Sequence, residues 1–321
     1  MNNVNVKNEK SLKENIHKIK RNSNFLYDFL ISGVAAAVGK TIVAPIERIK
    51  LLMQNQFIIQ SSHAKYNNIL HCGKEIVKKE GFFALWRGNV INVIRYVPTQ
   101  AFNFAFKDLF KTMFRKFDQK KEFWKFFAAN CFSGGLACAI SLLIIYPLDM
   151  ARTRLATDNI SKYGLRTYKG SIDCIVKIYK VDGVIGLYKG YFVAVIGLSL
   201  FKAFYFGGYD SLKGNYITDD TSWETKFMYA QIVTSLSAFM FYPFDTVRRR
   251  VMIQSGRYLS EKVYSSNIDC FTKIIKQEGI KGFHKGFSAQ LIRTIGAASI
   301  LVLYDGIQEY FGLERRKLGG I

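Results

Sequence analysis

The chain has 321 residues, of which 49% are hydrophobic, and its 46 Lys and Arg residues outnumber 24 Asp and Glu residues, for a formal net charge of +22. Soluble nucleic-acid-binding proteins are basic but seldom this apolar, whereas membrane proteins that handle anions are often both. The composition therefore argues against an ordinary soluble domain and favours a membrane protein with anionic partners.

The first 24 residues are polar and rich in lysine, but they contain Glu9 and Glu14 and no apolar run. A secretory signal needs an apolar core, and mitochondrial presequences are poor in acids. We therefore interpret residues 1–22 as a polar, basic, solvated tail.

Six segments approach the roughly 20 apolar residues that a membrane-spanning helix needs. They are residues 25–44, 89–106, 123–146, 190–209, 227–242 and 287–304. Several of them contain a single charge, such as Arg95 in the second. The pattern predicts an all-α membrane protein with six transmembrane helices.

An internal repeat organises these segments. Three prolines, Pro45, Pro147 and Pro243, are each followed by an acid two residues later. A cysteine lies 27 residues after each proline, at Cys72, Cys174 and Cys270. A glycine directly preceded by an acid lies 36 residues after each proline, at Gly81, Gly183 and Gly279. An aromatic or histidine, a basic residue and a second glycine follow, as WRG, YKG and HKG. This register predicts three tandem repeats of about 100 residues, at 23–118, 119–216 and 217–321, each pairing two spans around a short amphipathic segment.

These motifs resemble the mitochondrial carrier family, over residues 23 to about 312. Within it, the segments PIERIKLLMQ, YPLDMARTRLA and YPFDTVRRRVMIQSG are most similar to the ADP/ATP carriers. The resemblance implies pseudo-threefold symmetry around a central cavity. It also implies exchange of ADP for ATP across the mitochondrial inner membrane, or the membrane of a mitochondrion-derived organelle.

The proline motifs predict a matrix-side gate. A proline inside a span kinks the helix, so the acid two residues on and the base five residues on can face a central axis. Intramembrane charges are costly unless they pair. Around a threefold axis the pairs join neighbouring repeats: Glu47 with Arg152, Asp149 with Arg248, and Asp245 with Lys50. For one such pair alone we would favour a static clamp, but three symmetric pairs indicate a gate.

By the same resemblance, a cytoplasmic gate lies at the ends of the even spans. It pairs Asp108 with Lys213 and Asp305 with Lys111, but Gln308 stands where the family has a lysine. Asp210 then lacks an ionic partner, which predicts a weakened outer gate.

The three consecutive arginines cannot all serve one ion pair, because successive helical residues lie about 100° apart. Arg248 belongs to the gate. By resemblance Arg249 contacts Glu278 and Arg250 other matrix-side acids; the alternative is that both are interfacial charges. The family's nucleotide-carrier signature continues with three methionines, which are here Val251, Met252 and Ile253.

The substrate should bind where the repeats differ. Fifty residues after the prolines come Arg95, Gly197 and Arg293. Arginines bind phosphate in bidentate fashion, and a glycine leaves room for a flat base. The predicted binding residues are Lys40, Arg95, Asn103, Gly197, Leu198, Phe201, Lys202 and Arg293. The family's Tyr-Arg pair on the fourth span is here Phe201-Lys202, which keeps the charge and loses the bidentate geometry.

No catalytic constellation, phosphate-binding loop or metal-ligand spacing stands out, so we expect a transporter, not an enzyme, without cofactor or metal. Expected partners are ADP, ATP and membrane lipids, including cardiolipin on the matrix side, with a functional monomer and no nucleic acid. The alternatives are a carrier of another anion, such as another nucleotide or coenzyme A, and a basic membrane-surface or nucleic-acid-binding protein. A proton leak through the cavity is a further alternative.

Overall fold

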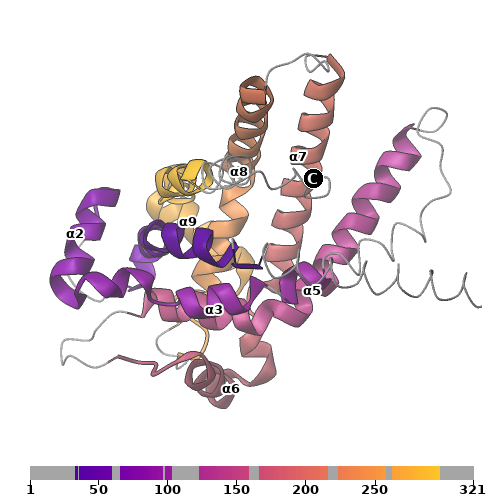
Figure 1. Cartoon of the computed structure of the whole chain (residues 1–321). Coiled ribbons are helices and arrows are strands. Elements are labelled where there is room, and N and C mark those ends of the chain that lie inside the picture. Colours follow the sequence, from indigo (N-terminus) through magenta and orange to yellow (C-terminus); the bar gives the residue numbers. More distant parts are fainter. Residues whose placement is uncertain are drawn as a thin grey trace, which may run out of the picture.

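The computed structural model describes residues 33–34, 36–59, 66–96, 98–102, 123–158, 166–215, 223–257 and 262–296 (Figure 1). Within these ranges all regular elements are helices. The predicted tail at 1–22 and several predicted site residues lie outside them, namely Asn103, Asp108, Lys111, Asp305 and Gln308, together with the side chains of Asp210 and Lys213.

Each repeat runs from a long helix through a short helix and a tight turn into a second helix. Repeat 1 has helical residues 36–59, α2 (Ile69–Glu80), the 3-10 turn η1 (Phe82–Trp86) and α3 (Asn89–Ile94). Repeat 2 has α5 (Phe123–Thr157), α6 (Ser171–Leu187) and α7 (Tyr191–Asn215). Repeat 3 has α8 (Trp223–Ile253), α9 (Asn267–Glu278), the 3-10 turn η3 (Ile280–Gly282) and helical residues 287–296. The three prolines lie inside the first helix of each repeat, and the helix continues past each of them.

The glycine after the acid ends α2 and α9, and in α6 it breaks the helix before its last turn. Gly81, Gly183 and Gly279 have φ values of 88°, 65° and 67°. Glycine adopts this left-handed region without the steric penalty of a side chain, so it can turn the chain at the helix end. The acid-glycine motif thus ends or breaks the short helix.

The second glycine motif brings neighbouring repeats together. A Cβ added to Gly88, Gly190 or Gly286 would lie 3.0 to 3.3 Å from a backbone carbonyl oxygen of the next repeat. Those oxygens belong to Arg152, Arg248 and Lys50, the three bases of the predicted matrix gate. The start of each even-numbered span therefore packs directly on the kinked helix of its neighbour.

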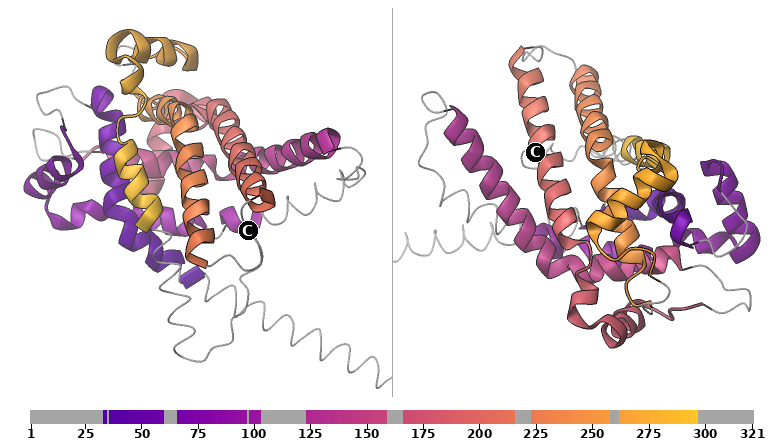
Figure 2. Two further views of the ribbon diagram at one scale, coloured as in Figure 1. Left: turned by 90° about the horizontal axis from the view of Figure 1, so that it is seen from above. Right: turned by 180° about the vertical axis from the view of Figure 1, so that it is seen from behind.

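Of the long helices, α7 and α8 stand side by side, whereas α5 leans away from them toward its N-terminal end (Figure 1). In both views of Figure 2, α7 runs beside α8, with which it makes its most extensive contacts. The cysteines Cys72, Cys174 and Cys270 lie on the inner faces of α2, α6 and α9 and are fully buried. Burial raises the pKa of each of these thiols to about 12, so they pack as small apolar residues, as their sequence position indicates.

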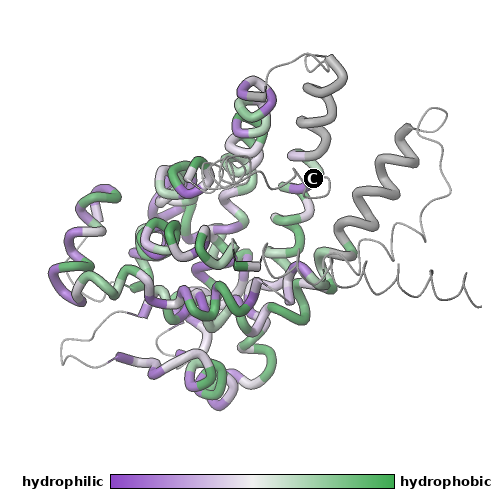
Figure 3. The backbone as a smooth tube through the Cα atoms, in the orientation of Figure 1, coloured by the Kyte–Doolittle hydropathy of each residue, from purple (hydrophilic) through white to green (hydrophobic). Residues whose placement is uncertain are grey.

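The short helices are amphipathic, and Figure 3 shows hydrophilic and hydrophobic residues alternating along α2. Each also exposes an apolar residue at the same register, with Leu70, Ile172 and Ile268 at 75%, 80% and 77% exposed. Among the described residues no helix taken singly has the length and apolarity to cross a membrane, whereas α6 and residues 191–205 of α7, bent by 53°, do so as a pair.

Candidate functional site

A cavity of about 340 Å³ lies between the long helices, at the level of the prolines. Seven basic side chains and two carboxylates line it. The bases are Lys40, Lys50, Arg95, Arg152, Arg248, Arg249 and Arg293, and the acids Glu47 and Asp245. This excess of positive charge makes it a site for an anion.

The structure places the three predicted matrix pairs in contact at the floor of this cavity. Arg152 bonds Glu47, Arg248 bonds Asp149, and Lys50 Nζ lies 2.8 Å from Asp245 Oδ2. Proline-kinked helices from different repeats supply the two members of each pair, as the threefold pattern predicts. The pairs are unequal, because the side chain of Asp149 is 1% exposed and that of Asp245 26%.

Arg249 joins two of these pairs, contrary to expectation. Its guanidinium lies 3.5 Å from Asp149, 3.4 Å from Asp245 and 2.5 Å from the Thr153 hydroxyl. The three arginines do not all serve one pair, as predicted, but the assignment of Arg248 alone to the gate is wrong, because Arg249 contacts Asp149 and Asp245. A long side chain at the end of a helix can reach back toward the axis despite the 100° rotation per residue.

The predicted contact between Arg249 and Glu278 is also wrong, because Arg250 binds Glu278 in bidentate fashion. Arg250 is fully buried, and it also reaches the hydroxyl of Tyr264. The rest of the signature, Val251, Met252 and Ile253, is buried as well, with at most 5% exposed. These side chains pack in the protein interior and do not line the cavity.

Sequence reasoning missed two buried arginines, Arg48 and Arg154, which form a set with Arg250. Arg48, Arg154 and Arg250 each donate to a backbone carbonyl near the end of the kinked helix of the next repeat, at Ala156, Ile253 and Gln54 respectively. The last carbonyls of a helix lack partners within it, so a cation there is stabilised. The signal was present in repeats 2 and 3, where an arginine follows the proline by seven residues.

Gln54 was missed too. Its Nε2 donates to the Thr246 hydroxyl at 2.9 Å and lies 3.3 Å from Asp245 Oδ2. The neutral amide of Gln54, which lies one helical turn after Lys50, thus supports the Lys50–Asp245 pair.

The two arginines predicted to bind phosphate both line the cavity, and each rests loosely against a gate acid. Arg95 lies 3.5 Å from Asp149, and Arg293 lies 3.5 Å from Glu47. The Nε atoms of Arg95, Arg248 and Arg249 are buried and have no hydrogen-bond partner. Buried donors without partners are rare in native proteins, so this wall of the cavity has unused capacity for an acceptor.

Lys40 also lines the cavity, where its ammonium lies 4.8 Å from the centre of the Tyr96 ring. Lys202, although half-buried on α7, does not line it. The structure therefore brings Lys40 to the predicted site and leaves Lys202 outside.

Gly197, Leu198 and Phe201 form an apolar wall along α7. A Cβ on Gly197 would lie 2.7 Å from Cβ of Phe244, so this glycine is also needed for the close approach of α7 to α8. Close packing of α7 on α8 is thus a second reason for a glycine at position 197, besides the room for a flat base that the sequence pattern predicted.

Outside the predicted spans, the acid before each helix-stopping glycine binds two bases. Asp182 accepts hydrogen bonds from Lys189, Lys262 and the amide of Gly256. Burial opposes its ionisation, but these donors outweigh burial and hold the pKa of the carboxyl below its usual range. Lys262 belongs to the third repeat, so this cluster fastens repeat 2 to repeat 3.

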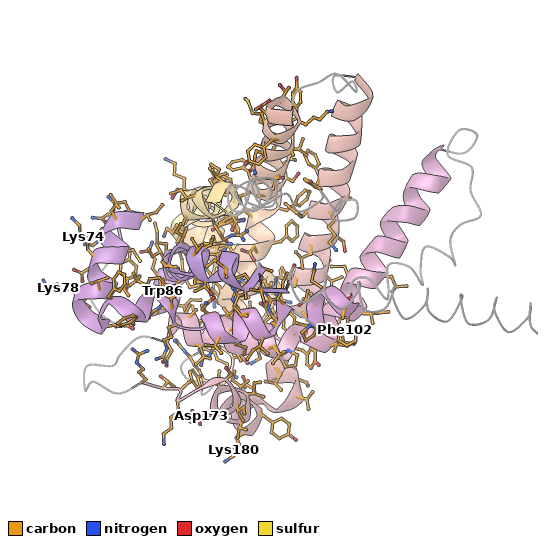
Figure 4. All side chains as sticks on the ribbon, in the orientation of Figure 1. Lys74, Lys78, Trp86, Phe102, Asp173 and Lys180 are labelled. Carbon is orange, nitrogen blue, oxygen red and sulfur yellow. The ribbon has the colours of Figure 1, made fainter. Side chains whose placement is uncertain are left out.

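Solvent-facing charges on the short helices lie apart from the cavity. Figure 4 shows Lys74 and Lys78 projecting outward from α2, and Asp173 and Lys180 on the outer side of α6. In the described part of the chain, no group of three or more His, Cys, Asp or Glu side chains is placed to hold a metal ion.

Comparison with known proteins places this geometry in context. The family model for mitochondrial carrier proteins matches three consecutive segments, residues 21–118, 123–220 and 219–315. This confirms the three tandem repeats predicted from the sequence.

Individual relatives match over nearly the whole chain. The chain is 48% identical to ADP/ATP translocase 4 of Homo sapiens over 296 residues, which are 91% of this chain and 93% of that protein. It is 47% identical to ADP/ATP translocase 4 of Mus musculus over 314 residues, 96% and 98% of the two chains. It is 50% identical to ADP/ATP translocase 2 of Rattus norvegicus over 293 residues, 89% and 98% of the two chains.

Proposed function

This chain belongs to the mitochondrial carrier family, and from that premise we propose that it exchanges ADP for ATP across the mitochondrial inner membrane. It is a multi-pass transporter of three repeats and not an enzyme. The relatives named as ADP/ATP translocases are about half identical to it over at least 89% of its length, which supports the choice of substrate.

The observation that carries the proposal is the state of Arg95 and Arg293. Both face the cavity, and each is 3.5 Å from an acid that already has a closer partner. A phosphate offers bidentate acceptors to a guanidinium and would compete well with a carboxylate at that distance. The phosphates of a nucleotide would therefore bind these two arginines, with Lys40 as a third positive group.

The base would lie against the apolar wall of Gly197, Leu198 and Phe201. The ring of Phe201 is stacked on Tyr205, with centroids 6.3 Å apart, so its orientation is supported. An aromatic wall opposite a cluster of arginines suits a flat base joined to phosphates. Asn103 remains a proposed polar contact, and we propose only an indirect electrostatic role for Lys202.

We propose that the three matrix pairs form a gate that is closed in this structure. A substrate phosphate that draws Arg95 from Asp149 and Arg293 from Glu47 changes the charge balance around both acids. Each of these pairs gains Coulomb energy that is largely offset by desolvation, so a small change in partners can favour opening. The cytoplasmic gate of Asp108, Lys111, Asp210, Lys213 and Asp305, with Gln308 in place of a lysine, would close in the alternate state.

Two further proposals concern partners. One chain surrounds the cavity, which supports transport by a monomer. The exposed apolar residues Leu70, Ile172 and Ile268 lie on short helices rich in lysine, which suits contact with anionic lipids such as cardiolipin on the matrix side.

The test is uptake of labelled ADP by proteoliposomes preloaded with ATP, with phosphate or with nothing. We expect uptake only into ATP-loaded vesicles and its loss in Arg95→Ala and Arg293→Ala. Lys180→Ala is the matched control, because it also removes one positive charge but from an exposed site on α6. A protein that unfolds cooperatively on heating but takes up no ADP would contradict nucleotide exchange and direct the search to other anions, including coenzyme A.

A further inference from the structure

The prolines create a bonding problem in each repeat. Proline has no N–H, so the carbonyl four residues earlier loses its helical hydrogen bond. The carbonyls concerned belong to Thr41, Leu143 and Phe239. Away from water an unsatisfied carbonyl is costly, and a neighbouring group must supply the missing donor.

In repeat 1 the donor is Trp86. Its indole Nε1 donates to the carbonyl oxygen of Thr41 at 2.8 Å. Trp86 is the aromatic residue of the WRG motif, 41 residues after Pro45, and Figure 4 shows it between α2 and the rest of the molecule. The Thr41 side chain is also held, by Asn89 at 3.0 Å. The carbonyl that Pro45 frees is therefore capped from the segment that leads into the second span.

In repeat 3 the same place is taken by a histidine. His284 also lies 41 residues after its proline, and its Nε2 is 3.2 Å from the carbonyl oxygen of Phe239. A carbonyl can only accept, so Nε2 carries the proton in this contact. The imidazole also stacks on the Phe239 ring, with centroids 4.5 Å apart. The substitution of a histidine for an aromatic residue thus preserves the donor.

Repeat 2 has a different arrangement. Tyr188 stacks on Tyr146, with ring centroids 5.9 Å apart and planes 11° from parallel. In the described structure its hydroxyl does not donate to Leu143. The Tyr146 hydroxyl donates to the carbonyl of Lys189 at 2.8 Å, as the equivalent Tyr242 hydroxyl does to the carbonyl of Lys285 at 3.3 Å in repeat 3. Repeat 2 therefore keeps this link between its kink and the next span but lacks the cap, and Tyr188 provides an internal comparison.

We propose that Trp86 and His284 are positioning residues that cap the carbonyls freed by Pro45 and Pro243. Each cap fastens a proline kink to the start of the following span, and it thereby orients the gate acid two residues after the proline, Glu47 or Asp245. The tryptophan indole and the histidine imidazole are interchangeable in this role because both present an N–H at the edge of a flat ring.

A double-mutant cycle on thermal unfolding of the purified protein tests this cap. We expect His284→Phe to lower the apparent unfolding temperature by about 2 °C or more, and His284→Trp to restore it. In a Pro243→Ala background the new backbone N–H can bond Phe239, so His284→Phe should have little effect there. An equal loss in both backgrounds, or no rescue by tryptophan, would overturn the proposal, because ring packing alone would then explain the effect.

Repeat 1 supplies a second test that does not require the proline variant. Trp86→Phe should lower the unfolding temperature and Trp86→His should largely retain it, whereas Tyr188→Phe should match the wild type. Equal losses in Trp86→Phe and Tyr188→Phe would also overturn the proposal. These measurements need no substrate, so they stand or fall separately from nucleotide exchange.

Discussion

Arginines and carboxylates meet in two regions of this molecule, and the two regions treat them differently. At the edge of the bundle, every guanidinium nitrogen of Arg48 and Arg250 has a partner, in carboxylates, a hydroxyl and backbone carbonyls. In the cavity, Arg95 shares an acid with other arginines at 3.5 Å and keeps a buried nitrogen unbonded.

The difference teaches which charges can exchange partners. A saturated buried pair is costly to break, since one partner is left without compensation. A guanidinium with loose contacts and an unused donor loses little when a ligand replaces its acid. Arg48 and Arg250, the outer arginines, therefore hold the repeats together, whereas Arg95 in the cavity is available to substrate.

Arg250→Met should give the largest effect on stability. It leaves Glu278 buried with Lys285 as its remaining basic partner, and removal of one member of a buried pair costs about 3 to 5 kcal/mol. We expect the apparent unfolding temperature of the purified protein to fall by about 6 °C or more. Lys276→Met is the control, because Lys276 is an exposed base on α9. Equal effects of the two variants would contradict a structural role for the outer arginines.

Arg95→Ala should show the reverse behaviour. Asp149 keeps Arg248 and Arg249, so we expect stability to change by less than about 1 kcal/mol. A lost charged hydrogen bond to phosphate should weaken ADP binding by about 10- to 100-fold. Titration calorimetry and thermal unfolding on the same sample measure both quantities. A large loss of stability with unchanged affinity would erase the distinction between the two regions.

The Asp182 cluster should make stability depend on acid pH. The pKa of the Asp182 carboxyl is lower in the folded protein than in the unfolded chain, where it is about 3.9. The carboxylate therefore contributes its full stabilisation above the unfolded pKa, and this stabilisation is lost as the pH falls toward the folded pKa. Asp182→Asn should cost about 2 kcal/mol at neutral pH, and the difference from wild type should shrink below about pH 4. Unfolding followed from pH 7 to pH 3 provides the check. A constant difference across this range would show that the carboxylate charge is not what matters.

Gln308→Lys should have the smallest effect. An added ion pair near the membrane surface contributes about 0 to 1 kcal/mol, so it should shift the balance between states by at most about fivefold. A cysteine at Phe201 in a chain otherwise free of cysteine can report this, through its labelling rate by an impermeant thiol reagent from the cytoplasmic side. We expect slower labelling with the added lysine. An unchanged labelling rate would contradict the prediction that Gln308 weakens the cytoplasmic gate.

Much of this site could be predicted because it repeats. The pairings of Glu47, Asp149 and Asp245 depend on a register counted from each proline. Threefold symmetry then leaves two cyclic arrangements that join neighbours, and the structure has the predicted one. The positions of Arg95 and Arg293 came from the same counting. The cytoplasmic gate stays a prediction, since its residues fall outside the described side chains.

Other features could not be predicted from spacing. The exchange of roles between Arg249 and Arg250, and the absence of Lys202 from the cavity, depend on how far flexible side chains reach at the ends of helices. Helical periodicity gives the direction of a Cβ atom but not the destination of a guanidinium several bonds away.

The sequence by itself determined the three repeats and the acids and bases that must pair, because these follow from covalent spacing and from the cost of unpaired charge in a membrane. Only the tertiary structure decided that Trp86 and His284 cap the carbonyls left by the prolines, that Gly197 meets Phe244, and that Arg250 and not Arg249 holds Glu278. Each of these depends on the distance between helices that are far apart in the chain, and packing sets that distance.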